Sequence, residues 1–412
     1  LSGEALHFSY PSVSNRCLKR RNRTKPAMEI RNIIVFCAAA LLSTTISCSK
    51  EWIPTPDPSQ TKWTNQGPES DDPTPEPEPS EKWTEITDAK VALGETKVAE
   101  QTSSTFMKGY WPDGKLIPIK KGNGWQLFWS EATDALTTGD TPYPEDHISK
   151  LVNSSKVWGK EFVRIDGFND GGSWFIGIFP LEKAGRYVGF FHAESHWDLS
   201  GTAHKSIGVV YSDDYGAKWH DPMPIITDKS PNPAKPDWTG LGDGCVIWDS
   251  ASSRYICYYQ GKVAGGANTL CMAASSDVNG APGTWKKWDG EDFTLDACSP
   301  ETGLGGENIP IANLTSPAGA NPSVMWNTFL KKWVMVYATW GKRVVITYSD
   351  DALHWSAPVK ILGSIGSPAW YPNLIGEDGD LTGGEVVKIY WSHNQNDQGI
   401  RDLGYCKIKF LK

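Results

Sequence analysis

An all-β fold is predicted from residue 85 onward, and three observations support it. Short apolar or alternating runs recur there, separated by glycine, proline, aspartate and asparagine, which is the pattern of strands joined by hairpin turns. No convincing amphipathic helix pattern exceeds two turns. A turn with serine, aspartate and tryptophan occurs in three versions, which start at Ser212, Ser276 and Ser349. A repeat of this kind in an all-β chain predicts the blades of a β-propeller.

The expected strands are the apolar or alternating runs between these turn signals. They cover residues 125–129, 174–179, 187–192, 207–211, 245–248, 255–259, 324–326, 333–339, 344–348 and 386–391.

The repeated turn predicts structure rather than chemistry. Residues 212–219 carry its full form, residues 349–355 a form one residue shorter, and residues 276–285 a stretched form. The short serine and aspartate side chains of such a turn bond its own backbone, while the tryptophan packs between sheets. The full form resembles the box found in sialidases and other propellers. We therefore expect no catalytic role for these residues.

The repeat spacing predicts five blades. The turns start 64 and 73 residues apart, and about five such units fit into the 328 residues from Glu85 to Lys412. Residues 85–93 resemble the outer-strand segment 355–362, so we expect them to add the outer strand of the last blade and close the ring. Six blades, as in sialidases, are the alternative. The expected blades cover residues 106–160, 161–230, 236–298, 299–362 and 363–412.

The residues before the propeller predict export and a lipid anchor. Residues 1–27 are polar and basic, and we expect them to be absent from the mature protein. Residues 28–47 contain an arginine and a ten-residue apolar run, which is too short for a membrane span. The following Cys48 completes a segment that resembles a bacterial lipobox, in which the cysteine is lipidated. Residues 48–84 are rich in proline and acidic residues and predict an extended tether. An ordinary signal peptide is the alternative.

Composition narrows the classes of molecule that the chain is expected to bind. The chain has 40 Lys and Arg against 48 Asp and Glu, a net charge of −8, which argues against nucleic-acid binding. Its 20 tryptophans suit aromatic surfaces that bind carbohydrate. Five cysteines follow Cys48 without a zinc-ligand spacing, so neither a disulfide framework nor structural zinc is expected. The sequence predicts a monomer on the outer membrane without a cofactor, and leaves bound calcium open.

Residues 190–198 are the first candidate site. On a strand, His192, Glu194 and His196 point to one face, because alternate residues share a face. We interpret this face as an active-site floor, with Glu194 as proton donor or base. A polar loop rim and a metal site are the alternatives.

The expected starts of inner strands supply further polar candidates. Asp243 lies between two glycines before a buried run, and a simple turn aspartate is the alternative interpretation. Corresponding positions in other blades are Asp113, Asp166 and Asp170, Asn321, and Asn373 in the segment that also contains Tyr371. Asp or Asn directed toward one axis from each blade is typical of a cavity that binds sugar.

Residues 162–166 resemble the sialidase motif whose arginine binds a carboxylate, but Asp166 replaces its proline. Arg164 is therefore a candidate substrate ligand, or forms a salt bridge to Asp166 or Asp170. Few other arginines are available for a sialidase-like clamp. Trp340 and His393 follow second-strand segments and are expected on the same rim.

Taken together, residues 85–412 resemble the five-bladed propeller glycoside hydrolases, the group of arabinanases, fructosidases and related furanosidases. The resemblance rests on the blade period, the repeated turn and the segments around Glu194, Asp243 and Asn321. It implies hydrolysis by two carboxyl groups. Glu194 is the expected acid, because flanking histidines, Phe190 and Phe191 favour its protonated form, and Asp243 or Asp113 is the base or nucleophile. A glycan-binding propeller without activity and a sialidase-like exo-glycosidase are the alternatives.

Overall fold

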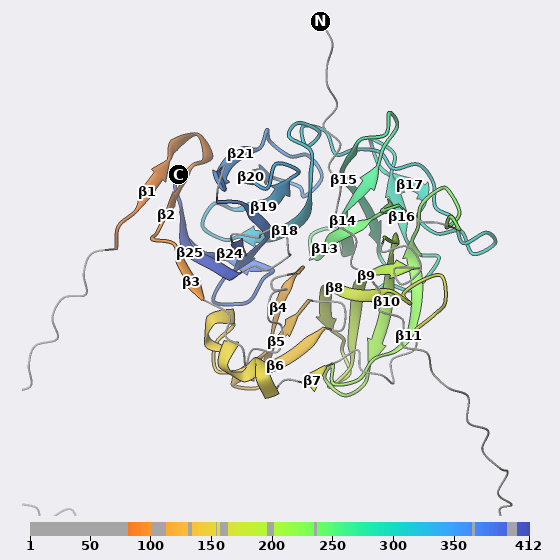
Figure 1. Ribbon diagram of the computed structural model, residues 1–412, viewed down its shortest axis with the longest axis horizontal. Helices are drawn as coiled ribbons and strands as arrows, with labels where there is room; N and C mark the ends of the chain where they lie inside the picture. The colour runs from red at the N-terminus through yellow and green to blue at the C-terminus, as the bar shows by residue number, and fades with distance from the viewer. Residues whose placement is uncertain are drawn as a thin grey trace, which may run out of the picture. The chain divides into compact units, whose positions relative to one another are not determined.

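Figure 1 shows the computed structural model. It describes residues 81–99, 113–130, 134–153, 155–156, 164–195, 202–234, 237–364, 367–393 and 402–412. All of them belong to the second of two compact units, Pro77–Lys412. The helical segments among them are three short 3₁₀ helices, η1 (Thr87–Ala89), η2 (Pro144–Asp146) and η3 (Ile148–Asn153). The predicted all-β fold is confirmed.

The strands form five antiparallel sheets, which are the blades. Blade I holds β4 (Leu116–Lys121), β5 (Gly124–Trp129), β6 (Ala135–Gly139) and β7 (Ser155–Lys156). Blade II holds β8 (Gly172–Pro180), β9 (Tyr187–Ser195), β10 (His204–Ser212) and β11 (His220–Ile226). Blade III holds β13 (Gly242–Asp249), β14 (Arg254–Lys262), β15 (Asn268–Ser275), β16 (Lys286–Trp288) and β17 (Phe293–Asp296).

The remaining strands complete the ring. Blade IV holds β18 (Gly319–Asn327), β19 (Lys332–Thr339), β20 (Val344–Ser349) and β21 (Val359–Leu362). Blade V holds β22 (Ala369–Ile375), β24 (Val386–His393), β25 (Asp402–Phe410), β1 (Thr84–Ile86), β2 (Val91–Leu93) and β3 (Lys97–Ala99). Two short strands, β12 (Thr239–Gly240) and β23 (Thr382–Gly383), pair in parallel with β10 and β18. The fold is thus a five-bladed propeller, and the six-bladed alternative is wrong.

The blades are arranged around one centre (Figure 1). Each sheet begins at the centre with one strand, namely β4, β8, β13, β18 or β22. The hydrophobic core lies between blades, and one large cluster joins residues of blades II and III, including Phe190, Val246 and Tyr259. Burial of such side chains against the neighbouring sheet stabilises each blade on its neighbours.

The ring closes within blade V, as the sequence predicted. β2 pairs with β25, and Val91 lies opposite Phe410 and Leu93 opposite Ile408. η1 then joins β2 to β1, which pairs with the free side of β2. The first and last described strands are therefore hydrogen-bonded parts of one sheet.

The repeated turns have a structural role in the folded chain. Ser212 Oγ accepts a hydrogen bond from the Gly216 N–H at 2.9 Å, and Asp214 Oδ1 accepts one from the main-chain N–H of Lys218 at 2.8 Å. The tryptophans of the three turns, Trp219, Trp285 and Trp355, are all buried. Each turn thus fixes its own backbone and anchors one indole in the core.

Candidate functional site

The starts of the five innermost strands meet at one end of the propeller, which we call the mouth. Contacts between blades hold them together there. The Leu116 N–H of β4 donates to Asn373 Oδ1 of β22 at 3.0 Å, and the Lys115 ammonium donates to Ser323 Oγ of β18 at 3.1 Å. The Trp174 indole of β8 donates to Asp113 Oδ2, just before β4, at 3.0 Å. Polar side chains near these starts therefore converge.

Glu194 and Asp243 are joined at the mouth through His192. The Asp243 N–H donates to His192 Nδ1 at 3.0 Å, so that ring nitrogen acts as an acceptor. The proton of a neutral imidazole then lies on Nε2, which donates to Glu194 Oε1 at 3.1 Å. His192 and Glu194 share one face of β9 and are both buried, as expected from their spacing. This imidazole fixes one oxygen of the Glu194 carboxyl group.

Lys205 supplies a buried positive charge to the same cluster. Its ammonium donates to Asp243 Oδ2 at 2.7 Å and to Gln260 Oε1 at 2.9 Å. Lys205 is also the direct cross-strand neighbour of Glu194. Burial alone raises the pKa of Asp243, but the Lys205 charge, the neighbouring His192 and the Lys205 hydrogen bond together outweigh burial and lower that pKa below its ordinary value. Asp243 is therefore ionised at neutral pH.

Lys205 and Gln260 were not predicted from the sequence. The available signal was periodicity, because Lys205 stands two residues before Ile207 and four before Val209, and both of these are fully buried. A lysine in phase with buried residues must find a partner inside the fold.

The glycines around Asp243 make room for this arrangement. A Cβ added at Gly242 would lie 2.0 Å from His192 Nδ1, and one at Gly244 would lie 2.6 Å from the Tyr258 carbonyl oxygen. Asp243 itself has a φ of 50°, in the left-handed region. The Gly-Asp-Gly sequence thus permits close approach by a neighbouring strand and the imidazole.

Asp113 and Trp174 extend the cluster. Besides its bond to Asp113, the Trp174 ring packs edge-on against His192, with the ring centroids 5.4 Å apart. The three predicted carboxyl groups, Glu194, Asp243 and Asp113, are thus linked through His192 and Trp174. Phe190 and Phe191 belong to hydrophobic clusters between blades, while His192 bonds the Glu194 carboxyl group.

Asn321 and Tyr371 occupy positions equivalent to Asp243 in blades IV and V. Their φ values are 55° and 49°, and each stands where the register of the innermost strand shifts. Asn321 is mostly buried, and the Tyr371 ring packs against Trp370 with the centroids 5.9 Å apart. Non-glycine residues held in the left-handed region of three innermost strands indicate strain concentrated at the mouth.

Other predicted residues lie in different surroundings. Arg164 is exposed and donates to the main-chain carbonyl of Asp170 at 2.9 Å, and Asp166 is also exposed. His393 ends β24 and accepts the Trp391 indole N–H at 3.2 Å, and burial lowers the pKa of His393. Trp340 lies at the end of β19 and is 47% exposed. His196 and Cys48 lie outside the described residues.

A buried polar cluster forms the floor of the mouth. Lys115 bonds Ser323 and lies 3.5 Å from Asp380 Oδ2, with both charged side chains buried. Burial raises the pKa of Asp380, although the Lys115 charge opposes this shift. Asn373 also donates from Nδ2 to the Gly114 carbonyl at 3.0 Å. These contacts tie blades I, IV and V together beneath the candidate site.

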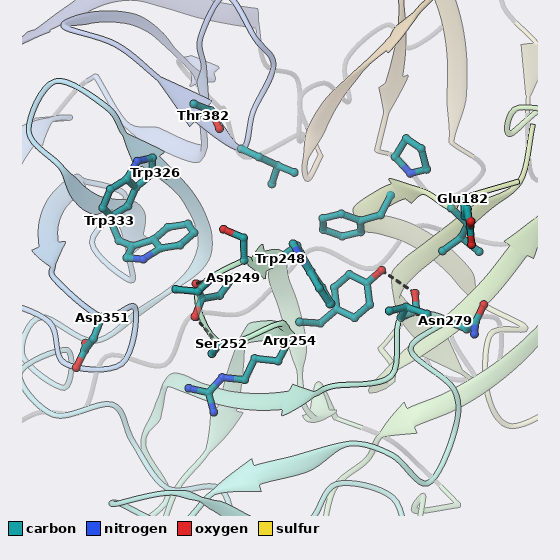
Figure 2. A pocket seen from close by; sticks show the side chains of 18 of the residues that line it. Glu182, Trp248, Asp249, Ser252, Arg254, Asn279, Trp326, Trp333, Asp351 and Thr382 are labelled. Carbon is teal, nitrogen blue, oxygen red and sulfur yellow. Dashed lines mark hydrogen bonds between the residues drawn. The ribbon is translucent and has the colours of Figure 1, made fainter. Parts of the chain in front are cut away.

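A second hollow lies at the opposite end of the innermost strands. Its volume is about 1230 Å³, and its lining includes Trp248, Asp249, Trp326 and Trp333. In Figure 2, Trp326 and Trp333 lie to one side of Trp248. Asp249 bonds its own turn, through the Ala251 N–H at 3.1 Å and the Ser252 hydroxyl. Its carboxylate is therefore already engaged in holding that turn.

Charged groups in the described ranges do not assemble a metal site or an arginine clamp. No group of three or more His, Cys, Asp and Glu side chains there is placed to hold a metal ion. Arg186 pairs with Asp213, and Arg254 lies over the Phe293 ring. The five described cysteines are free thiols. In this part of the chain no helix is long and apolar enough to cross a membrane.

Comparison with solved structures finds propeller glycoside hydrolases at low similarity. The arabinanase of Cellvibrio cellulosa is 11% identical, with a TM-score of 0.43, and 70% of this chain and 90% of that chain are covered. The α-L-arabinofuranosidase of Podospora anserina, solved with cellotriose, is 10% identical, with a TM-score of 0.44 and coverage of 76% and 94%. A family 117 glycoside hydrolase of Zobellia galactanivorans is 12% identical, with a TM-score of 0.42 and coverage of 78% and 90%.

No protein-family model and no curated protein matches this chain. At the identities and TM-scores found among solved structures, the similarity does not assign an activity. The five-bladed fold follows from the strand pairing of the chain itself.

Proposed function

We propose that this chain is a glycoside hydrolase that cleaves an extracellular oligo- or polysaccharide at the propeller mouth. The observation that carries the proposal is the connected group of Glu194, His192, Asp243 and Lys205. It combines two carboxyl groups in different environments, one of which is paired with a buried ammonium. Glycosidic hydrolysis requires two carboxyl groups, one that donates a proton and one that acts as base or nucleophile.

Glu194 is the proton donor in this proposal. The His192 Nε2–H occupies Oε1, so Oε2 is the oxygen that carries the proton to the leaving glycosidic oxygen. After the transfer, the same N–H stabilises the new carboxylate. Asp243, held ionised by Lys205, is unsuited to donate a proton. It serves instead as the base that activates water or as the nucleophile, and Asp113 is the alternative for this role.

Reducing-sugar release from plant, host and bacterial-wall glycans tests the proposal. We expect Glu194→Gln to lower kcat/KM at least about a hundredfold, equivalent to about 2.7 kcal/mol of transition-state stabilisation. The matched control is Glu182→Gln, since Glu182 is exposed and lines the opposite hollow. Circular dichroism and Tm establish that both variants fold.

Each outcome has a defined meaning. Activity unchanged in Glu194→Gln but lost in Asp243→Asn or Asp113→Asn would overturn the role of Glu194 and keep the hydrolase. Retained glycan binding without release of sugar from any substrate would overturn hydrolysis and favour a capture protein.

We also infer, from the sequence, that Cys48 is lipidated and holds the propeller at the outer membrane surface. Labelled palmitate should enter the wild-type protein and be absent from Cys48→Ala. Cys298→Ala, which removes a partly buried free thiol, is the control and should label normally. Equal labelling of Cys48→Ala would contradict the inference.

A further inference from the structure

A groove of about 520 Å³ lies at the mouth end of blade IV. Ala318, just before β18, and Thr339, at the end of β19, contribute to it, and Gly319 pairs with Thr339 in the sheet. The groove therefore opens at the same end of the propeller as Glu194 and Asp243. Its volume falls within the range of about 300–1,000 Å³ typical of small-ligand sites.

Trp340 forms an aromatic platform in this groove. Its side chain is 47% exposed, although tryptophan is highly buried on average. Its indole N–H donates to the Asn268 carbonyl of blade III at 2.9 Å, which fixes the ring at the boundary between blades. An exposed indole held in place costs little entropy when a ligand stacks on it.

Two more aromatic rings connect this platform with the mouth. The Trp340 and Trp370 centroids are 5.8 Å apart, and those of Trp370 and Tyr371 are 5.9 Å apart. Tyr371 stands near the start of innermost strand β22, in the position that corresponds to Asp243. A chain of sugar residues bound at the mouth thus has a continuous aromatic path into the groove.

The charge of the groove is positive. Arg343 and Lys360 line it, both are exposed, and the lining contains neither aspartate nor glutamate. Within the described ranges neither cation forms an ion pair. The opposite hollow, in contrast, includes the carboxylates of Asp249, Asp350 and Asp351. A cationic groove without a paired carboxylate, on a chain of net charge −8, favours an anionic ligand.

We propose that this groove binds an acidic sugar residue, with its ring on Trp340 and its carboxylate on Arg343 and Lys360. The inference rests on the proposed glycan-cleaving function and specifies its substrate as an anionic polysaccharide. A guanidinium matches a carboxylate with two parallel hydrogen bonds, which favours a uronic acid. A sulfate ester is also an anion that a guanidinium binds, so a sulfated polysaccharide is tested separately.

The test measures binding by the slowed variant Glu194→Gln, so that the ligand is not consumed. Calorimetry or affinity electrophoresis would compare polygalacturonate, a sulfated dextran and neutral arabinan. We expect polygalacturonate to bind at least tenfold more tightly than arabinan, with an affinity that falls as salt rises. Adding Arg343→Gln and Lys360→Gln should remove at least tenfold of that affinity. Trp340→Ala should weaken binding further.

The matched control is the double change Lys183→Gln and Arg186→Gln, which removes two charges from the opposite hollow. It should leave binding unchanged. Tighter binding of the sulfated dextran than of polygalacturonate would overturn the carboxylate assignment. Equal affinity for arabinan, or no effect of the Arg343 and Lys360 changes, would overturn the acidic-sugar subsite while leaving the hydrolase proposal intact. Polygalacturonate binding that depends on these cations, without cleavage of any glycan, would support the subsite and contradict hydrolysis.

Discussion

The mouth and the opposite hollow both place carboxylates beside tryptophans, but the partners of those carboxylates differ. At the mouth, Asp243 bonds Lys205 and His192, which stand 38 and 51 positions away in the sequence. At the opposite end, Asp249 and Asp351 bond residues two or three positions away. Hydrogen-bond partners that are close in the sequence hold a turn. Partners that are distant in the sequence come together only when the chain has folded. Under the proposed function, we therefore expect the chemistry at the mouth and a structural role for the carboxylates of the opposite hollow.

Removal of the buried ammonium at the mouth should have the largest effect. Lys205→Met leaves Asp243 ionised and unpaired in a mostly buried position, which typically costs about 3–5 kcal/mol of unfolding free energy. Denaturant unfolding measures this loss. The control is Lys332→Met, which breaks a more exposed pair with Asp350 and should cost under about 1 kcal/mol. Equal losses would contradict the contrast between the two ends.

The second-largest effect is expected from adding a single methyl group at the mouth, which should impair catalysis. Gly242→Ala would place its Cβ 2.0 Å from His192 Nδ1, so the imidazole must move away from Glu194 and Asp243. We expect kcat/KM to fall about a hundredfold, because small misplacements of catalytic groups have effects of this size. Gly384→Ala is the control, since its Cβ would meet open space. Full activity in Gly242→Ala would show that His192 does not position Glu194.

At the opposite end, loss of a carboxylate should affect stability alone. Asp351 Oδ1 accepts hydrogen bonds from the N–H groups of Leu353 at 2.9 Å and His354 at 2.8 Å. Asp351→Ala should therefore lower the unfolding free energy by about 1–2 kcal/mol, as loss of a helix cap does. Sugar release and unfolding of the same preparation measure both properties. A loss of activity larger than the loss of folded protein would place chemistry at this end.

The smallest expected effect is a pH dependence of stability at the mouth. The pKa of Asp243 is lower in the folded chain than its ordinary value near 3.8, because Lys205 outweighs burial. The stabilisation that the Asp243 carboxylate gives the folded chain is therefore complete above its ordinary pKa. It is lost as the pH falls through the lower pKa that Asp243 has in the folded chain. The difference in unfolding free energy between wild type and Asp243→Asn should become smaller as the pH is lowered from about 5 toward the pH at which acid unfolds the protein. A constant difference would contradict the ion pair.

Much of the fold could be predicted from the sequence, because its signals are local and repeated. The three turns set the blade period, and residues 85–93 resembled an outer strand closely enough to indicate the ring closure. The paired His192 and Glu194 followed from strand alternation. These predictions need only the period of a strand and the chemistry of a turn.

The partners at the mouth could not be predicted in this way. Lys205 faces Asp243 because β10 of blade II and β13 of blade III come together, and Trp174 of blade II bonds Asp113, which precedes β4 of blade I. Lys115 and Asp380 meet on the floor from opposite ends of the propeller sequence. Such contacts depend on the register and packing of whole sheets, which no local pattern encodes.

The strand pairing that closes blade V has a consequence for the order of folding. Val91 pairs with Phe410, so nearly all of the propeller sequence lies between β2 and β25. β2 precedes blades I to IV in the chain and β25 follows them, so β2 lacks this partner until the intervening blades are in place. Joining ends so far apart carries a loop-closure entropy cost and slows folding. The ring can therefore close only late in folding, when β25 is available to pair with β2.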